Sequence, residues 1–456
     1  MALGGESWTD RLVAPDALWS HRRATAWWVA AVVAVFGIGL IAGHGNNPLI
    51  DLRVYRVGGL SWLKGLPLYT SRFPAPLEGP NLPFTYPPFA AVAFSGLGLL
   101  GYYAAAMVMA IIGFSSLTWT IHLVTRGRSR AAANPAMAPK FVVLLTLCAL
   151  VLEPVSSTLL HGQINLLLMG LVATDALARK TLLPRGVLAG IAAAMKLTPA
   201  VFLLYFVARR QWRAAGVMAA SFVVSTLVGA LAAPADSRTY WTATVFDPSR
   251  IGDLGYASNQ SIRGAIHRLG FSMHTETVAW FVVSMLVIAI AYRGARVMHA
   301  RANAAAALAV VAACQLLISP VSWSHHWVWV APMLVPVAAR TFWCGTRLRK
   351  AAMSALLAVF LIGPHWLFPN DHGREMHWAW WENAIGDTYT IVTLGFVVWS
   401  ATVRVRAVRA ASSPAEPVAD DLEPPRVTVI APRAAEPAAL PATQVALSSA
   451  APPRSS

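Results

Sequence analysis

The sequence predicts an all-α polytopic membrane protein. Of its 456 residues, 57% are hydrophobic and only 12% are charged, and the mean hydropathy is +0.55. A soluble domain could not bury that much apolar surface. The formal net charge of +16 comes from Lys and Arg residues that cluster between apolar stretches rather than along one basic face. This is the positive-inside pattern of a membrane protein, and it argues against a nucleic-acid partner and for contact with membrane lipids.

The first apolar stretch, at about 25–43, is expected to be a retained membrane helix. It follows Arg22 and Arg23, and no small-residue cleavage site precedes Asp51. The basic residues place segment 1–23 in the cytoplasm and the loop 44–102 outside. Within that loop, the apolar stretch 88–101 is too short to cross a hydrocarbon core of about 30 Å, so we expect an interfacial or re-entrant helix.

Eleven further spans complete a topology of twelve spans with both termini in the cytoplasm. Basic clusters mark the inner ends, at 126–130, 179–180, 209–210, 293–301, 340–350 and 404–409. The expected spans are about 103–124, 141–159, 163–178, 184–197, 199–208, 213–233, 275–292, 303–319, 327–340, 351–368 and 387–404.

The membrane domain therefore covers 24–404, with further external loops at about 234–274 and 364–387. Spans 184–197 and 199–208 are short, so we expect their exposed backbone to line a protein-enclosed or water-filled cavity within the membrane. The Ala- and Pro-rich segment 405–456 has no hydrophobic periodicity and is expected to be a disordered cytoplasmic tail.

In this topology, unusual polar residues from six separate segments come to the outer ends of helices. Ionisable groups at membrane depth are costly and usually mark function, so we expect an outward-facing site there. The candidates are Asp51, Arg53, Tyr55, Tyr86, Glu153, His161, Gln163, Asn165, Lys196, Asn259, Gln260, Arg263, Trp323, His325 and His326.

Purely structural roles stay open for individual candidates. Asp51 could cap a helix over 52–60, since Asp is a favoured N-cap residue. Gln163 and Asn165 could join helices through hydrogen bonds. Lys196 could extend to the lipid headgroups.

No metal and no cofactor are expected. His325 and His326 are adjacent, so their imidazoles point in different directions on a helix, and no further ligand follows one turn later. The cysteines, at positions 148, 314 and 344, lie in separate apolar regions without the spacing of a disulfide framework or a metal site.

The external loop 364–387 is rich in tryptophan, with Trp366, Trp378, Trp380 and Trp381. Two interpretations stay open for these side chains. They form an aromatic belt at the level of the lipid headgroups, or they form a wall on which the sugars of an acceptor stack.

An ordered set of short motifs resembles glycosyltransferase family 87, over about residues 45–330. The motifs are Asp51-x-x-x-Tyr55, Gly65-x-x-x-Tyr69, Tyr86-Pro87-Pro88, Gly162-Gln163-x-Asn165, Lys196-x-x-Pro199, Asn259-Gln260-Ser261 and Ser319-Pro320-x-Ser322-Trp323-x-His325-His326. The resemblance implies a GT-C-type bundle of about twelve membrane helices with external interfacial helices. It also implies polyprenyl-phosphate-mannose as donor. Within the family, the motif set is most similar to that of the α-1,2-mannosyltransferases that extend phosphatidylinositol mannosides, with the branching enzymes of lipomannan as the alternative.

The resemblance also implies a mechanism at the outer face of a bacterial plasma membrane. Asp51 would be the general base that removes the proton of the acceptor hydroxyl in one inverting displacement. Lys196, Arg263, His325 or His326 would support the charge of the leaving phosphate, and a monophosphate can leave without a divalent ion. The lipid tail of the donor would lie between helices near 88–101.

A transporter for a lipid-linked sugar is the alternative from another class of protein. Such a protein would be expected to carry ionisable residues near the bilayer midplane, often with internal repeats. The candidates here lie at helix ends, and the sequence shows no internal repeat. An enzyme is therefore the favoured interpretation.

Overall fold

The computed structural model describes residues 49–126, apart from positions 72, 74–76, 78 and 81, and residues 138–403. Over these ranges the regular structure is helical, with one isolated β-bridge between Asn259 and Trp323. The predicted all-α class is therefore confirmed. The expected first helix, 25–43, and the expected segments 1–23 and 405–456 lie outside the described residues.

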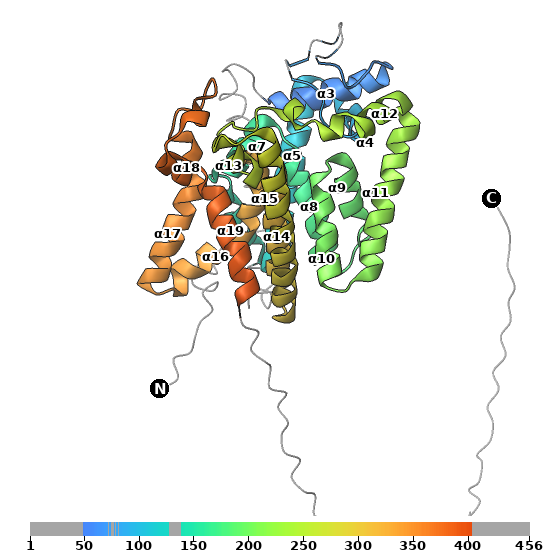
Figure 1. Ribbon diagram of the computed structural model, residues 1–456. Coiled ribbons are helices and arrows are strands. Elements are labelled where there is room, and N and C mark those ends of the chain that lie inside the picture. The colour runs from blue at the N-terminus through green and yellow to red at the C-terminus, as the bar shows by residue number, and fades with distance from the viewer. Residues whose placement is uncertain are drawn as a thin grey trace, which may run out of the picture. The chain divides into compact units, whose positions relative to one another are not determined.

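Long apolar helices run side by side and form the body of the described part (Figure 1). Four are long and apolar enough to cross a membrane, and two bent pairs raise this number to six if each pair is one span. The four are α5 (Tyr102–Thr125), α11 (Trp212–Ala232), α14 (Met273–Ala300) and the continuation of η5 (Ser324–Trp329) into α16 (Val330–Cys344). By length and composition, the described residues thus support membrane insertion, while the count of twelve spans stays a prediction.

Several expected spans match observed helices within two residues. The segments 163–178, 213–233 and 303–319 correspond to α8 (Asn165–Leu177), α11 and α15 (Ala304–Ile318). Local capping explains such a boundary. Asn303 precedes α15, and its Oδ1 accepts a hydrogen bond of 3.0 Å from the amide of Ala306, which satisfies one of the free donors at the start of a helix.

The expected span 141–159 is broken rather than continuous. Helix α6 (Ala138–Ala149) and helix α7 (Glu153–His161) meet at an angle of 79°. Pro154 lies in the first turn of α7, where it starts a new helix and cannot continue the previous one. Helix α7 ends at Gly162, whose φ of 68° favours glycine, and a Cβ there would come within 2.8 Å of the Cβ of Leu52. The break therefore turns the segment 153–163 across the end of the bundle.

The expected span 351–368 is shorter than predicted. Helix α17 (Arg347–Ile362) stops because Gly363 adopts a φ of 64° and Pro364 follows, so the chain enters the short helix η6 (Pro364–Trp366). The loop continues through η7 (Arg374–His377) and α18 (Trp380–Gly386), which joins α19 (Thr388–Thr402) at a bend of 65°.

Short helices cover one end of the bundle, which we call the α3 end (Figure 1). Helix α3 (Ile50–Leu63) lies across this end, and it packs closely on α4 (Pro88–Leu99), because Gly59 leaves room for the backbone of Phe94. Helix α4 corresponds to the segment expected to be interfacial or re-entrant. Further helices of this part of the fold are α12 (Pro234–Thr242), η3 (Thr244–Phe246), η4 (Pro248–Ile251) and α13 (Ile262–Arg268).

The two short expected spans form a broken helix pair. Helix α9 (Val187–Met195) ends at Lys196, whose backbone is extended with φ −147° and ψ 123°. The chain then turns into η2 (Thr198–Phe202) and α10 (Leu203–Ala208). We call this interruption the α9–η2 break, and it leaves the side chain of Lys196 at a helix terminus rather than on a helix face.

Candidate active site

Aromatic and amide side chains from three segments meet beneath α3. The Tyr55 hydroxyl donates to Oε1 of Gln163 at 2.7 Å and lies 3.0 Å from the Tyr86 hydroxyl. The Lys196 Nζ lies 5.7 Å from the centre of the Tyr86 ring, within the range of a cation–π contact. The fold thus joins four predicted site residues that come from α3, from the segments before α4 and α8, and from the α9–η2 break.

Asp51 lies in the first turn of α3, next to this group. Leu49 occupies the N-cap position, so the alternative role of Asp51 as the helix cap is wrong. Burial raises the pKa of the Asp51 carboxyl above its usual range, opposed by the charge of His161, a hydrogen bond with Gln163 and the charge of Lys196. A carboxylate with a raised pKa is a better proton acceptor, which suits a general base.

Lys196 is hydrogen-bonded inside the cluster. Its Nζ donates to Oδ1 of Asn165 at 3.0 Å and to Nε2 of His326 at 3.1 Å. Because an ammonium group has no lone pair, Nε2 of His326 must accept, which leaves the proton of the neutral ring on Nδ1. These contacts disfavour the alternative in which Lys196 extends to the lipid headgroups.

Two further imidazoles stack beside this pair. The ring centres of His161 and His325 are 4.7 Å apart, with an angle of 27° between the ring planes. The ring centres of His325 and His326 are 4.8 Å apart. Nδ1 of His161 is 2.7 Å from the carbonyl of Ser157, so it carries the ring proton there and leaves Nε2 as an acceptor when the ring is neutral. One ammonium and three imidazoles can together bind an anion such as a phosphate.

The segment that carries the two histidines is held from several sides. The carbonyl of His325 accepts hydrogen bonds from Nδ2 of Asn165, at 3.0 Å, and from the Thr158 hydroxyl. Ser324 donates from its amide to the Ser258 hydroxyl at 3.1 Å. Sequence reasoning missed Thr158 and Ser258, because a single hydroxyl in an apolar span or a loop carries no distinguishing signal.

Glu153 was predicted to bind substrate, and the structure gives its carboxylate three protein donors. Oε1 accepts from the Ser324 hydroxyl at 2.8 Å and from the Trp366 indole at 3.2 Å, and Oε2 accepts from the Tyr389 hydroxyl at 2.9 Å. Glu153 thereby connects α7, η5, η6 and α19. This arrangement suits a residue that positions the histidine segment.

Asn259 and Gln260 brace the loop before α13. Oδ1 of Asn259 accepts a hydrogen bond of 2.9 Å from the backbone amide of Ser322. Asn259 also forms the isolated β-bridge with Trp323. Nε2 of Gln260 donates to the carbonyls of Ala257 and Gly386, at 2.9 and 3.0 Å. The sequence predicted that Asn259 would lie beside Asp51. The structure instead bonds Asn259 to the segment that leads to His325.

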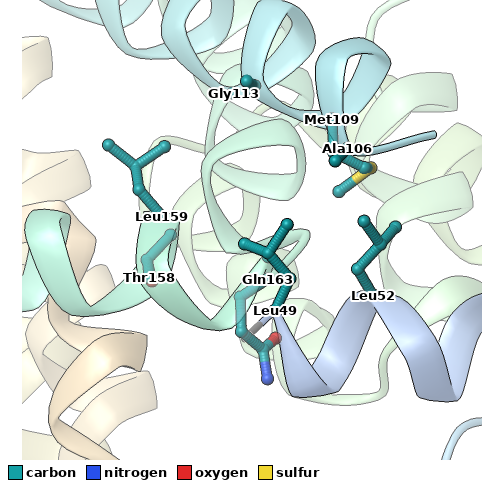
Figure 2. Close-up of a pocket in the computed structure, with 10 residues that line it drawn as sticks. Leu49, Leu52, Ala106, Met109, Gly113, Thr158, Leu159 and Gln163 are labelled. Atoms are coloured by element: carbon teal, nitrogen blue, oxygen red, sulfur yellow. The ribbon is translucent and has the colours of Figure 1, made fainter. Parts of the chain in front are cut away.

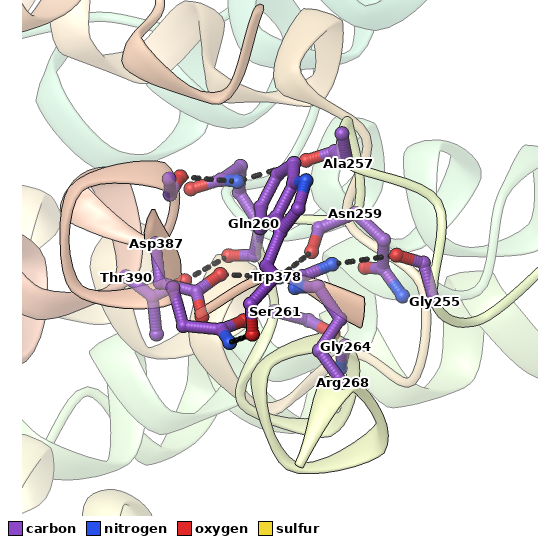
Figure 3. A network of polar contacts seen from close by, with 12 residues as sticks. Gly255, Ala257, Asn259, Gln260, Ser261, Gly264, Arg268, Trp378, Asp387 and Thr390 are labelled. Carbon is purple, nitrogen blue, oxygen red and sulfur yellow. Dashed lines mark hydrogen bonds and ion pairs between the residues drawn. The ribbon is translucent and has the colours of Figure 1, made fainter. Parts of the chain in front are cut away.

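The two buried arginines of α13 are paired with acidic residues. Arg263, predicted to bind substrate, forms an ion pair with Glu276 at 2.8 Å. Arg268 pairs with Asp387 and stacks against Trp378, as Figure 3 shows. Sequence reasoning missed the second pair, because its partners are 119 residues apart.

Arg53 is half-buried on α3, and an apolar recess of about 30 Å³ lies under the same helix (Figure 2). The side chains of Leu49, Leu52 and Met109 point toward one another there, while the amide of Gln163 points away from them.

Among the described residues, no group of three or more His, Cys, Asp or Glu side chains could hold a metal ion.

Comparison with known proteins decides the family. The profile of glycosyltransferase family 87 matches residues 84–320. A protein of Mycobacterium tuberculosis named polyprenol-phosphate-mannose-dependent alpha-(1-2)-phosphatidylinositol mannoside mannosyltransferase is 36% identical over 393 residues, which cover 82% of this chain and 90% of the relative. The chain belongs to glycosyltransferase family 87. The predicted family and the predicted enzyme class are therefore confirmed, and the transporter alternative is set aside.

Two other relatives of this family 87 enzyme carry related names. A Mycolicibacterium smegmatis protein of the same name is 36% identical over 402 residues, covering 83% of this chain and 91% of the relative. A second Mycobacterium tuberculosis protein, whose name specifies a phosphatidylinositol pentamannoside, is 32% identical over 423 residues, covering 88% and 93%. No solved structure matches the chain significantly. The profile match includes Gln163, Asn165 and Lys196, whereas Asp51 and the histidine pair lie outside it.

Proposed function

We propose that this family 87 enzyme transfers mannose from polyprenyl-phosphate-mannose to a mannosylated phosphatidylinositol and forms an α-1,2 linkage. The names of the 36% identical relatives support the donor, the linkage and the acceptor class. The observation that carries the proposal for this chain is the placement of the Asp51 carboxyl beside Gln163 and Lys196, with Lys196 bonded to His326. A proton acceptor and a phosphate-binding group thus lie side by side.

Asp51 acts as the general base in this proposal. The acceptor hydroxyl gives its proton to the Asp51 carboxylate while its oxygen attacks the anomeric carbon of the mannose. The bond between that carbon and the phosphate oxygen breaks at the same time, so a β-linked donor yields an α-linked product in one step. The hydrogen bond from Gln163 keeps the carboxylate oriented for this proton transfer.

Lys196 and the histidines stabilise the leaving group. The phosphate gains negative charge as the bond breaks, and charged or polar donors already in place lower the energy of that transition state. The Lys196 ammonium and the Nδ1 proton of His326 are such donors, and His325 lies beside them. Polyprenyl phosphate would leave with its charge matched by these groups.

The lipid tail of the donor requires apolar space near the phosphate site. The sequence placed it near 88–101, where α4 packs tightly against α3. An apolar cavity of about 440 Å³ borders η5 and is lined by Trp327, Trp329, Met333 and Phe360 among others. We favour this cavity for the tail, because Trp327 directly follows His326 in the chain.

We propose that the site faces the outside of a bacterial plasma membrane. The basic residues at 209–210, 301 and 347–350 border helix ends that lie opposite the α3 end in Figure 1. The positive-inside rule places such ends in the cytoplasm. The α3 end, with Asp51, is then on the outer face.

The direct test offers purified full-length protein either polyprenyl-phosphate-mannose or a nucleotide-activated mannose as donor. The acceptors are a series of phosphatidylinositol mannosides and lipomannan. We expect mannose transfer to at least one member, with a product that an α-1,2-specific mannosidase cleaves. Transfer only to lipomannan would support the branching alternative. Transfer from a nucleotide sugar instead of the lipid donor would contradict the proposal.

A further inference from the structure

Three aromatic rings from separate loops meet beside the histidine segment. Tyr256 lies before α13, Trp323 precedes η5, and Trp366 ends η6. The centre of the Tyr256 ring is 5.9 Å from Trp323 and 6.0 Å from Trp366, with interplanar angles of 70° and 64°. Trp323 is two residues before His325, so the group adjoins the candidate active site. We call Tyr256, Trp323 and Trp366 the aromatic platform.

The orientation of the platform is fixed by contacts within the protein. The Trp366 indole donates to the same Glu153 oxygen that accepts from Ser324. Trp323 is held by its bridge with Asn259, and its ring lies so close to Gly252 that a Cβ there would approach it to 2.9 Å. Rings held in this way lose little conformational entropy when a ligand binds.

The platform is partly open to a ligand. Trp366 is 37% exposed, and Tyr256 and Trp323 are half-buried. Two other tryptophans of the same loop differ in exposure. Trp378 is buried against Arg268, and Trp380 is 82% exposed on α18.

An acidic group with unused hydrogen-bonding capacity lies beside the platform. Glu375 is 2% exposed. Burial, and to a lesser extent the nearby charge of Glu375, raises the pKa of the Tyr256 hydroxyl. Its Oε2 has no hydrogen-bond partner among the described residues. A buried acceptor of this kind is costly unless a ligand or a water molecule supplies a donor.

Partly exposed aromatic rings and one free carboxylate oxygen, Oε2 of Glu375, together match the chemistry of a sugar. The C–H faces of a pyranose pack against aromatic rings, and its hydroxyls donate to carboxylates. A headgroup belt differs, because its tryptophans meet lipid and its indole N–H groups meet water or headgroups. The Trp366 indole N–H is bound to Glu153 inside the protein.

We propose that Tyr256, Trp323 and Trp366 form a subsite for the acceptor glycan, binding sugars that lie beyond the residue that receives the new mannose. This inference rests on the proposed function in one respect, that the acceptor is a glycolipid. It refines the expected stacking wall, because only Trp366 of that loop belongs to the platform. Glu153 then connects the glycan subsite to the histidine segment through one carboxylate.

The test compares a long and a short acceptor on the same lipid anchor. Octyl α-mannoside and the octyl glycoside of an α-linked mannotetraose are each assayed with polyprenyl-phosphate-mannose. The measured quantity is the ratio of kcat/KM for the long acceptor to kcat/KM for the short one. Because both values come from one preparation, partial loss of folded protein cancels in this ratio.

We expect Trp366→Ala and Tyr256→Ala to lower the ratio about tenfold, the size of a good aromatic contact. Trp366→Phe keeps a ring and should retain most of the ratio. Trp380→Ala is the matched control on an exposed tryptophan of the same loop and should leave the ratio unchanged. Unchanged ratios in Trp366→Ala and Tyr256→Ala would overturn the subsite.

A second measurement separates this inference from the proposed function. Saturation-transfer NMR with free mannotetraose needs neither donor nor turnover, so it tests the platform even if the wild-type enzyme uses neither glycoside as acceptor. We expect signal transfer to the oligosaccharide in the wild type and in Trp380→Ala, and its loss in Trp366→Ala. Equal signals in all three proteins would contradict the subsite whatever the donor is.

Discussion

The Nζ atom of Lys196 lies 3.1 Å from Nε2 of His326 and connects the α9–η2 break to the start of η5. The two residues are 130 positions apart in the chain. Lys196 also donates to Asn165, which in turn donates to the carbonyl of His325. One cation therefore fixes the geometry of both histidines at the proposed phosphate site.

Replacing Lys196 by Met should weaken donor binding. A hydrogen bond to a charged group contributes about 1.5–3 kcal/mol, so the KM for the lipid donor should rise roughly tenfold to a hundredfold. Steady-state kinetics at varied donor concentration measures this. Lys64→Met, at an exposed lysine just after α3, is the control and should behave like the wild type. An unchanged donor KM in Lys196→Met would remove Lys196 from the phosphate site.

Replacing Glu153 by Gln should lower stability and turnover together. The amide group places N–H groups against at least one of the donors Ser324, Trp366 and Tyr389, and an unpaired buried donor costs about 1–3 kcal/mol. Thermal unfolding should therefore shift to lower temperature, and kcat should fall while the donor KM changes little. Asp371→Asn, in an exposed ion pair, is the control. A raised substrate KM with unaltered unfolding would return Glu153 to direct substrate binding.

Labelling of single cysteines should establish which face carries the site. In a background free of Cys148, Cys314 and Cys344, a membrane-impermeant thiol reagent added to intact cells should modify a cysteine at Leu269 and miss one at Leu182. Both positions are exposed, and they lie before α14 and between α8 and α9. The reverse pattern would place Asp51 on the cytoplasmic face.

The sequence predicted the helices better than it predicted their breaks. Apolar length and basic flanks located α8, α11 and α15 within two residues, because these features reflect the membrane itself. The 79° bend between α6 and α7 depends on one Pro at the start of a helix. A Pro in an apolar run can also lie inside a continuous helix, as Pro336 does in α16, so the sequence alone did not predict the break.

The site was predictable as a set of residues but not as a set of contacts. The order of motifs identified Asp51, Gln163, Lys196 and His326, which the fold brings together. The same motifs did not reveal that Asn259 would bond to Ser322 instead, since an amide in a loop can bind a ligand or brace the backbone with the same atoms. Contacts between distant segments depend on packing that a single sequence does not show.

The raised pKa of Asp51 predicts a pH-dependent effect on stability. Burial favours the protonated carboxyl, so the folded-state pKa lies above the unfolded value of about 3.9. The ionised group then costs stability above the folded pKa, and this cost vanishes below the unfolded pKa. Thermal unfolding of Asp51→Asn should therefore occur at or above the wild-type temperature at pH 8, with a difference that shrinks toward pH 4. A variant that is less stable at pH 8 would contradict the burial effect.

The role of Asp51 as general base is the central claim, and single-turnover transfer by Asp51→Asn tests it most directly. The amide keeps the size of the side chain and removes the basic oxygen, and general-base catalysis contributes about 10²–10⁴ in rate. With donor bound to saturation, the rate of mannose transfer should fall at least about a hundredfold, while the dissociation constant for the donor stays within a few-fold of the wild type. A near-normal single-turnover rate, together with an inactive His325→Ala or His326→Ala variant that still binds donor, would contradict the account and assign the base to a histidine.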